Sequence, residues 1–143
     1  MLSDVRGLQH ADSHEFSNIN CKDEKFTLDE AEHAIEVMGA FKEGSHRNSW
    51  LDDMSINSLK ILLGLALCNE HETLFNQVTS VLGPNHIKPF NDNYKQAKRG
   101  YSKIVLYLFE LALKAAIIGS DMKQVSVVIS FSKSYNYLCT LDE

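Results

Sequence analysis

Residues 55–68 read SINSLKILLGLALC, and this stretch decides the fold class. From residue 61 to residue 68 every position except Gly64 is hydrophobic, so the segment has no face suited to water. A helix that is apolar around its whole circumference must be enclosed by other elements. We therefore expect a helix that begins near Ser55 and lies at the centre of the protein.

The segment that follows predicts an antiparallel partner for this central helix. Asn69 is placed to cap a third helix, with Glu72 as its reciprocal partner. Apolar residues then recur at helical spacing until Gly83-Pro84 ends the pattern. Because the join around Asn69 is short, the two helices must be antiparallel neighbours, which gives a helical hairpin over residues 55–82.

A second hairpin is expected over residues 101–138, joined around Gly119. Its first helix covers residues 101–118, and its second begins at Asp121, with Gln124 completing a capping box. In the second segment Val and Ile alternate with Ser, which also fits a β-strand. A lone strand would have no pairing partner in this chain and would expose its edge, so we expect a helix here.

Two further helices complete the predicted fold. Thr27 and Glu30 form a capping box ahead of a helical apolar stripe, and Gly44 is a suitable terminator for that helix. A short polar helix is expected over residues 92–99. The prediction is an all-α protein, a compact bundle of five or six helices built around two antiparallel helical hairpins, with a polar N-terminal tail (1–25) and a single helical domain (26–143).

Composition excludes several classes of protein. The chain has 143 residues, of which 44% are hydrophobic and 23% charged, and its formal net charge is −5. It is too apolar for a disordered chain, and its longest apolar run, residues 104–118, is too short and too charged to span a bilayer. The first residues lack the apolar core of a secretory signal. Three cysteines without CxxC spacing indicate free thiols in a reducing compartment, so we expect a cytoplasmic protein, with Cys68 buried.

Catalytic and metal-binding signatures are missing from the sequence. No nucleophile elbow, phosphate-binding loop, dinucleotide fingerprint or zinc motif occurs. Glu70-His71-Glu72 is better explained as the solvated start of a helix, because adjacent helical residues point in different directions. His10 and His14 would share a helical face suited to a metal, but their surroundings do not favour a helix. We therefore expect no enzyme activity, no cofactor and no metal.

The charge is distributed unevenly along the chain. Residues 88–103 carry five basic side chains and one acidic one, a net charge of +4, which leaves −9 on the rest of the protein. Three interpretations of this basic segment remain open: a solvated stretch paired with the acidic N-terminal third, a contact site for an acidic protein, or a site for nucleic acid or phosphate. The candidate contact residues are Lys95, Lys98, Arg99, Lys103, Tyr94 and Tyr101.

The first predicted helix is acidic, in contrast to the basic segment over residues 88–103. Its acidic residues gather toward the N-terminal half, where the helix dipole stabilises negative charge. Glu32 and Glu36, one turn apart, remain available for a basic partner. The two most apolar helices compete for one core, so one of them could expose a surface for homodimerisation or for a partner helix, unless the other helices and Trp50 cover both.

These features predict a non-enzymatic interaction or regulatory protein that acts through a binding surface, in the manner of an adaptor, chaperone, inhibitor or immunity-type protein. Small acidic helical proteins without catalytic motifs commonly have these roles, so this expectation is based on analogy between folds. The expected partner is another protein, or a second copy of the chain, and not a membrane. The alternative is a nucleic-acid-associated helical protein that uses the basic 88–103 segment.

Overall fold

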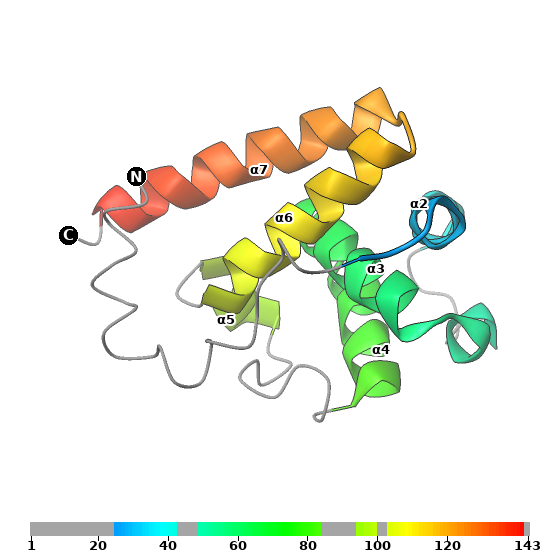
Figure 1. The fold of residues 1–143 in the computed structure, drawn as a ribbon. Coiled ribbons are helices and arrows are strands. Elements are labelled where there is room, and N and C mark those ends of the chain that lie inside the picture. The colour runs from blue at the N-terminus through cyan, green and yellow to red at the C-terminus, as the bar shows by residue number, and fades with distance from the viewer. Residues whose placement is uncertain (1–24, 43–48, 84–93, 100–102, 142–143) are drawn as a thin grey trace.

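The computed structural model describes residues 25–42, 49–83, 94–99 and 103–141. Within these ranges the chain forms six α-helices, one 3₁₀ helix and no strand, packed compactly on one another (Figure 1). In chain order the elements are α2 (Leu28–Ala40), η2 (Ser49–Asp53), α3 (Ile56–Cys68), α4 (Glu72–Leu82), α5 (Tyr94–Arg99), α6 (Lys103–Ile118) and α7 (Met122–Leu141). The predicted all-α class is confirmed, whereas the division into tail and domain stays a prediction.

Helix α3 is the central element, as expected. It packs against α2, α4 and α6 and also contacts α5 and α7. All its residues from Ile61 to Cys68 are buried. It approaches α6 closely at Gly64, where a Cβ atom would overlap the carbonyl oxygen of Leu108 and lie 3.2 Å from the Cβ of Ala112. The two apolar helices therefore bury each other by direct backbone contact.

The first hairpin, α3 and α4, is closed by a Schellman turn. The His71 N–H donates to the carbonyl of Ala66 at 2.9 Å, and the Glu70 N–H donates to the carbonyl of Leu67 at 3.1 Å. Glu70 has a φ of 55°, the left-handed conformation that this turn requires. The helix direction thus reverses within three residues.

The second hairpin, α6 and α7, uses the same turn. The Asp121 N–H donates to the carbonyl of Ala116 at 2.9 Å, and Ser120 takes the left-handed position with a φ of 57°. Gly119 is therefore not the left-handed residue of this join. A Cβ at Gly119 would lie 3.1 Å from Cδ1 of Ile35, so the glycine lets α2 approach the end of α6.

Two of the predicted capping boxes are wrong. Asn69 closes α3 instead of opening α4: its side-chain amide donates to the carbonyl of Leu65 at 2.7 Å and to Oε1 of Gln124 at 3.1 Å. The N-cap of α4 is His71, which makes no capping bond with its side chain. Oδ1 of Asp121 accepts from the Gln124 N–H at 2.9 Å, but the Gln124 side chain turns to Asn69 instead of completing the box. This polar pair ties the end of α3 to α7.

Other boundaries follow the expectations except at the ends of α2 and α7, since α7 continues to Leu141 and not to residue 138. The Thr27–Glu30 capping box is present, and residues 122–141 form a helix and not a strand. However, α2 ends at Ala40, because Phe41 adopts an extended conformation and turns into the core, where it is 8% exposed. Gly44 lies outside the described residues.

Candidate partner-binding surfaces

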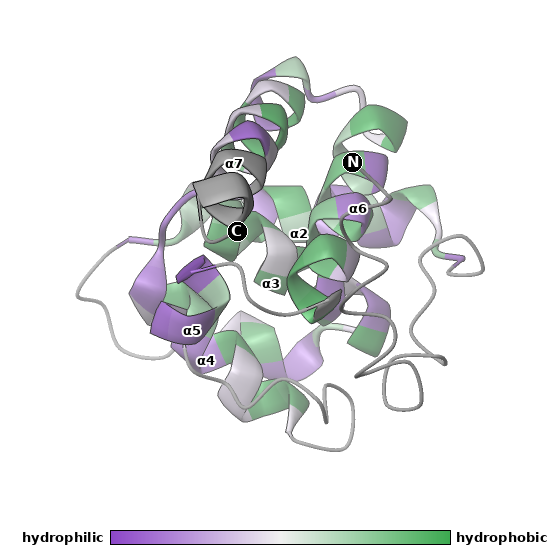
Figure 2. Ribbon diagram, turned by 90° about the vertical axis from the view of Figure 1, so that its left-hand side faces the viewer, coloured by the Kyte–Doolittle hydropathy of each residue, from purple (hydrophilic) through white to green (hydrophobic). Residues whose placement is uncertain are grey.

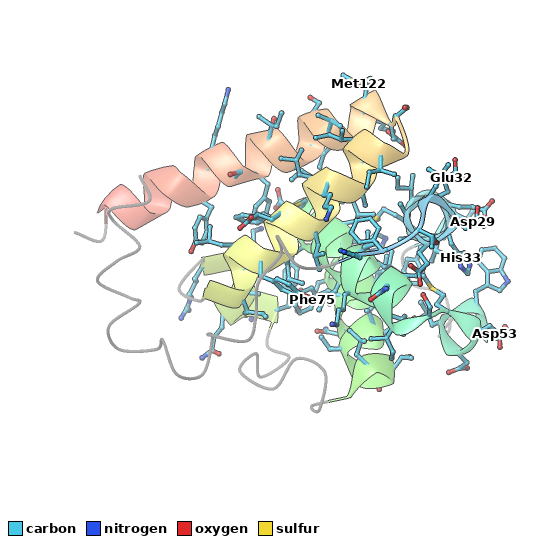
Figure 3. The ribbon with its side chains drawn as sticks, viewed as in Figure 1. Asp29, Glu32, His33, Asp53, Phe75 and Met122 are labelled. Carbon is cyan, nitrogen blue, oxygen red and sulfur yellow. The ribbon has the colours of Figure 1, made fainter. Side chains whose placement is uncertain are left out.

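Helix α2 has an acidic outer face. Asp29, Glu32 and Glu36 are exposed and fall within an arc of about 60° on the helix. Figure 3 shows Asp29 and Glu32 directed away from the bundle. Among the described residues none of the three carboxylates takes part in an ion pair. The residues of α2 that face the core are Ala31, Ala34, Val37 and Met38.

Glu30 fixes the start of α2 against the start of α3. Its carboxylate accepts from the Thr27 N–H at 2.9 Å and from Oγ of Ser55 at 3.0 Å, and Nδ2 of Asn57 lies 3.4 Å from it. Oγ of Ser58 donates to the Glu30 carbonyl at 2.9 Å. The Thr27 N–H lowers the pKa of Glu30, partial burial opposes it, and the Ser55 and Asn57 side chains lower it further. This acid is therefore a structural clamp, which leaves the outer carboxylates available for another role.

The 3₁₀ helix η2 places a tryptophan at the surface. Trp50 is 50% exposed, whereas the adjacent Leu51 is fully buried. Of these two residues it is Leu51 that enters the core, and the alternative in which Trp50 and the other helices cover both apolar helices stays a prediction. Adjacent residues of a 3₁₀ turn point in different directions, so only one of the two could do so.

Two further acids accompany this tryptophan. Asp52 and Asp53 are exposed, and Asp53 precedes by two residues the Ser55 that bonds to Glu30. Figure 3 places Asp53 on the same side of the molecule as Asp29. Together α2 and η2 contain six acidic residues and no Lys or Arg. We refer to the following residues as the α2–η2 face: Asp29, Glu32, Glu36, Trp50, Asp52 and Asp53.

One of the two aromatic residues predicted to serve the basic segment, Tyr94, is not presented at the surface. Tyr94 is 7% exposed, and its ring packs edge-on against Phe75 with centroids 5.2 Å apart. Burial raises the pKa of Tyr94. Tyr94 is thus a core residue that anchors α5, and its ring is not available to stack on a base or a partner. Tyr101 lies outside the described residues.

The basic side chains of α5 differ in their surroundings. Lys98 forms an ion pair with Glu70, with Nζ and Oε1 2.6 Å apart, and this hydrogen bond raises the pKa of Lys98. Lys95 and Arg99 are exposed. Lys103 begins α6, but the description does not extend to its side chain. Within the described part of the chain, Lys98 therefore pairs with the turn between α3 and α4 and not with the acidic first helix.

The acidic and basic surfaces are far apart. In Figure 1, α2 lies at the right and α5 at the lower left, with α3 and α6 between them. Figure 2 shows that α5 is mainly hydrophilic on the side of the molecule away from α2. The basic residues of α5 therefore do not neutralise the α2–η2 face of the same molecule.

Exposed hydrophobic side chains gather near the turn between α6 and α7. Ile117 is 59% exposed and Met122 is 73% exposed, and Met122 lies at the tip of the hairpin in Figure 3. Ile118 and Ile129 are exposed by 39% and 41%. The predicted homodimerisation surface would have to be sought here, and it stays a prediction.

The described residues were predicted to include one buried thiol and no metal site. No group of three or more His, Cys, Asp or Glu residues among them could hold a metal ion. The ring of His71 packs edge-on against Phe41 with centroids 4.8 Å apart. Cys68 is buried as predicted, which raises its pKa to about 12 and suppresses the thiolate. His10 and His14 lie outside the described residues.

Comparisons with protein families, with curated proteins and with solved structures each gave no match. Among the helices that the structure describes, none combines the length and the apolar character needed to cross a bilayer.

Proposed function

We propose that this chain is a non-enzymatic interaction or regulatory protein of the cytoplasm that binds another protein through the α2–η2 face. The observation that carries the proposal is the half-exposed Trp50 of η2 together with five exposed acids, in two elements that contain no Lys or Arg. Tryptophan is highly buried on average, and it is enriched among the residues that dominate binding energy at interfaces. Acidic side chains on the same face as such a residue speed association with a basic partner and disfavour acidic ones.

The rigidity of the face also supports the proposal. The hydrogen bonds of Glu30 hold the start of α2 to the start of α3, and Leu51 anchors η2 in the core. A preformed surface loses little conformational entropy on binding, so more of the contact energy is retained as affinity.

The proposal can be tested by affinity capture from the native source. The baits are the wild type, the variant Glu32→Lys/Glu36→Lys, and a control, Glu72→Lys/Glu110→Lys, which has the same charge change at exposed acids outside the face. We expect the wild type and the control to retain a common protein that the first variant recovers at least about tenfold less. Recovery of no specific protein by the wild type would contradict the proposed function.

A second candidate, nucleic-acid binding, uses Lys95, Lys98, Arg99 and Lys103. The observation in its favour is that Lys95 and Arg99 are exposed on the hydrophilic α5. Its test is a salt titration of binding to single- and double-stranded oligonucleotides, because contacts to phosphate weaken steeply with salt. Absence of binding at low salt, or no change on reversing the four charges, would remove this candidate.

A further inference from the structure

The carboxylates of α2 define the spacing of the groups that would meet them. Asp29, Glu32 and Glu36 lie on one stripe and span about 10 Å along the helix axis, at 1.5 Å per residue. A second helix lying along α2 presents a matching stripe when Lys or Arg residues are three and four positions apart. An extended chain places alternate side chains on opposite faces and matches this spacing less well.

Apolar groups at the same end of the molecule give the surface a second component. Leu28 is 48% exposed and begins α2, while Ile56 is 39% exposed and begins α3. The bonds of Glu30 hold these two helix starts together, and η2 with Trp50 immediately precedes α3. A polybasic chain without apolar side chains would leave this part of the surface in water.

We infer that the α2–η2 face takes a basic amphipathic helix of the partner protein, with Lys or Arg opposite the α2 carboxylates and an apolar side chain against Trp50. The inference rests on the proposed function and adds the chemistry of the partner. Charge complementarity selects this occupant: the face has five acids and no Lys or Arg, so an acidic segment or nucleic acid is repelled. The basic α5 of the same molecule lies on the other side of the bundle and does not compete for the face.

The test uses the only tryptophan of the chain as its reporter. The probe is a synthetic helical peptide with Lys at positions i, i+3 and i+7 and Leu on the adjoining face, added to the whole protein at physiological ionic strength. We expect a saturable blue shift of Trp50 fluorescence as the indole leaves water. A peptide of the same design with Glu in place of Lys should give no shift.

Variants then locate the site, with a dye-labelled peptide and its anisotropy as a readout independent of tryptophan. Glu32→Lys/Glu36→Lys should weaken binding at least about tenfold, and Trp50→Ala should weaken it by a similar factor. The control Glu72→Lys/Glu110→Lys should stay within about twofold of the wild type. Circular dichroism of each variant checks that the helices are intact.

The outcomes separate this inference from the proposed function. Equal binding by the wild type and the α2 variant, or no binding of the basic peptide, overturns the inference. If affinity capture still yields a specific partner in that case, the proposed function stands and its surface lies elsewhere. If the peptide does not bind and capture yields no partner, both fail.

Discussion

The substitution Gly64→Ala tests the packing that holds the fold together. Gly64 lies where α3 and α6 touch, and an added Cβ would overlap the carbonyl oxygen of Leu108, a backbone atom that cannot rotate away. The same Cβ would lie 3.2 Å from the Cβ of Ala112, tighter than an ordinary contact. The two helices must therefore move apart, which loosens the contacts on both sides of the crossing.

The expected cost follows from two opposing effects. Overpacking a well-packed core costs about 1–3 kcal/mol. Replacing glycine by alanine inside a helix returns about 0.5–1 kcal/mol through the lower entropy of the unfolded chain. The net expectation for Gly64→Ala is a loss of about 1 kcal/mol in the free energy of unfolding, within a range of about 0–2.5 kcal/mol.

Urea denaturation followed by circular dichroism measures this change. The matched control is Gly39→Ala in α2, where nothing lies within 4 Å of the added Cβ, so only the gain of about 0.5–1 kcal/mol should remain. The two alanines should thus shift the midpoint in opposite directions. If Gly64→Ala stabilises the protein as much as Gly39→Ala does, the close crossing of α3 and α6 is refuted.

Three other predictions concern local features. Ser120→Gly should raise the free energy of unfolding by about 0.5–1 kcal/mol, because Ser120 holds a left-handed φ of 57°; a loss in thermal or urea denaturation would contradict this. The pKa of Glu30 in the folded protein lies below the ordinary value of 4.5. The ionised Glu30 carboxylate therefore stabilises the fold fully above pH 4.5, and this stabilisation is lost as the pH falls through the pKa of the folded state. The stability gap between the wild type and Glu30→Gln should therefore narrow on acidification, and a gap independent of pH between 5 and 3 would argue against the clamp. In a Cys21→Ser/Cys139→Ser variant, Cys68 should resist a thiol reagent at neutral pH until the protein unfolds, because its pKa is about 12; fast labelling of the folded protein would disprove its burial.

Local signals with a single interpretation predicted their elements correctly. The Thr27–Glu30 capping box needs only neighbouring residues, and both of its bonds form. The apolar run of α3 could be satisfied only at the centre of a bundle, which is where the structure places it. Such patterns fix an element because no distant residue can offer a competing arrangement.

Asn69 shows where local reasoning fails. The same side chain can cap the following helix or bond back to the preceding one, and the choice depends on Gln124 from α7, which is 55 residues away. The end of α2 has a similar explanation, since Phe41 leaves the helix to reach the core and the ring of His71. Tertiary contacts decided both boundaries, and the sequence carries no local trace of them.

The candidate surfaces were predictable only in part. The charge pattern identified Glu32 and Glu36 on an outer face, and periodicity was sufficient for that. Trp50 and Asp53 belong to η2, which lies between α2 and α3 in the chain. Helical periodicity within α2 could not predict where the residues of η2 would lie. Tyr94, grouped with the basic residues by its place in the sequence, is instead buried against Phe75.

The most direct test of the central claim is a map of amide chemical-shift changes in the ¹⁵N-labelled protein on titration with the basic amphipathic peptide. The account predicts that the largest changes fall on α2 and η2 and include the indole N–H of Trp50. Changes centred on α5 or on the turn between α6 and α7, with the α2–η2 face unaffected, would contradict it.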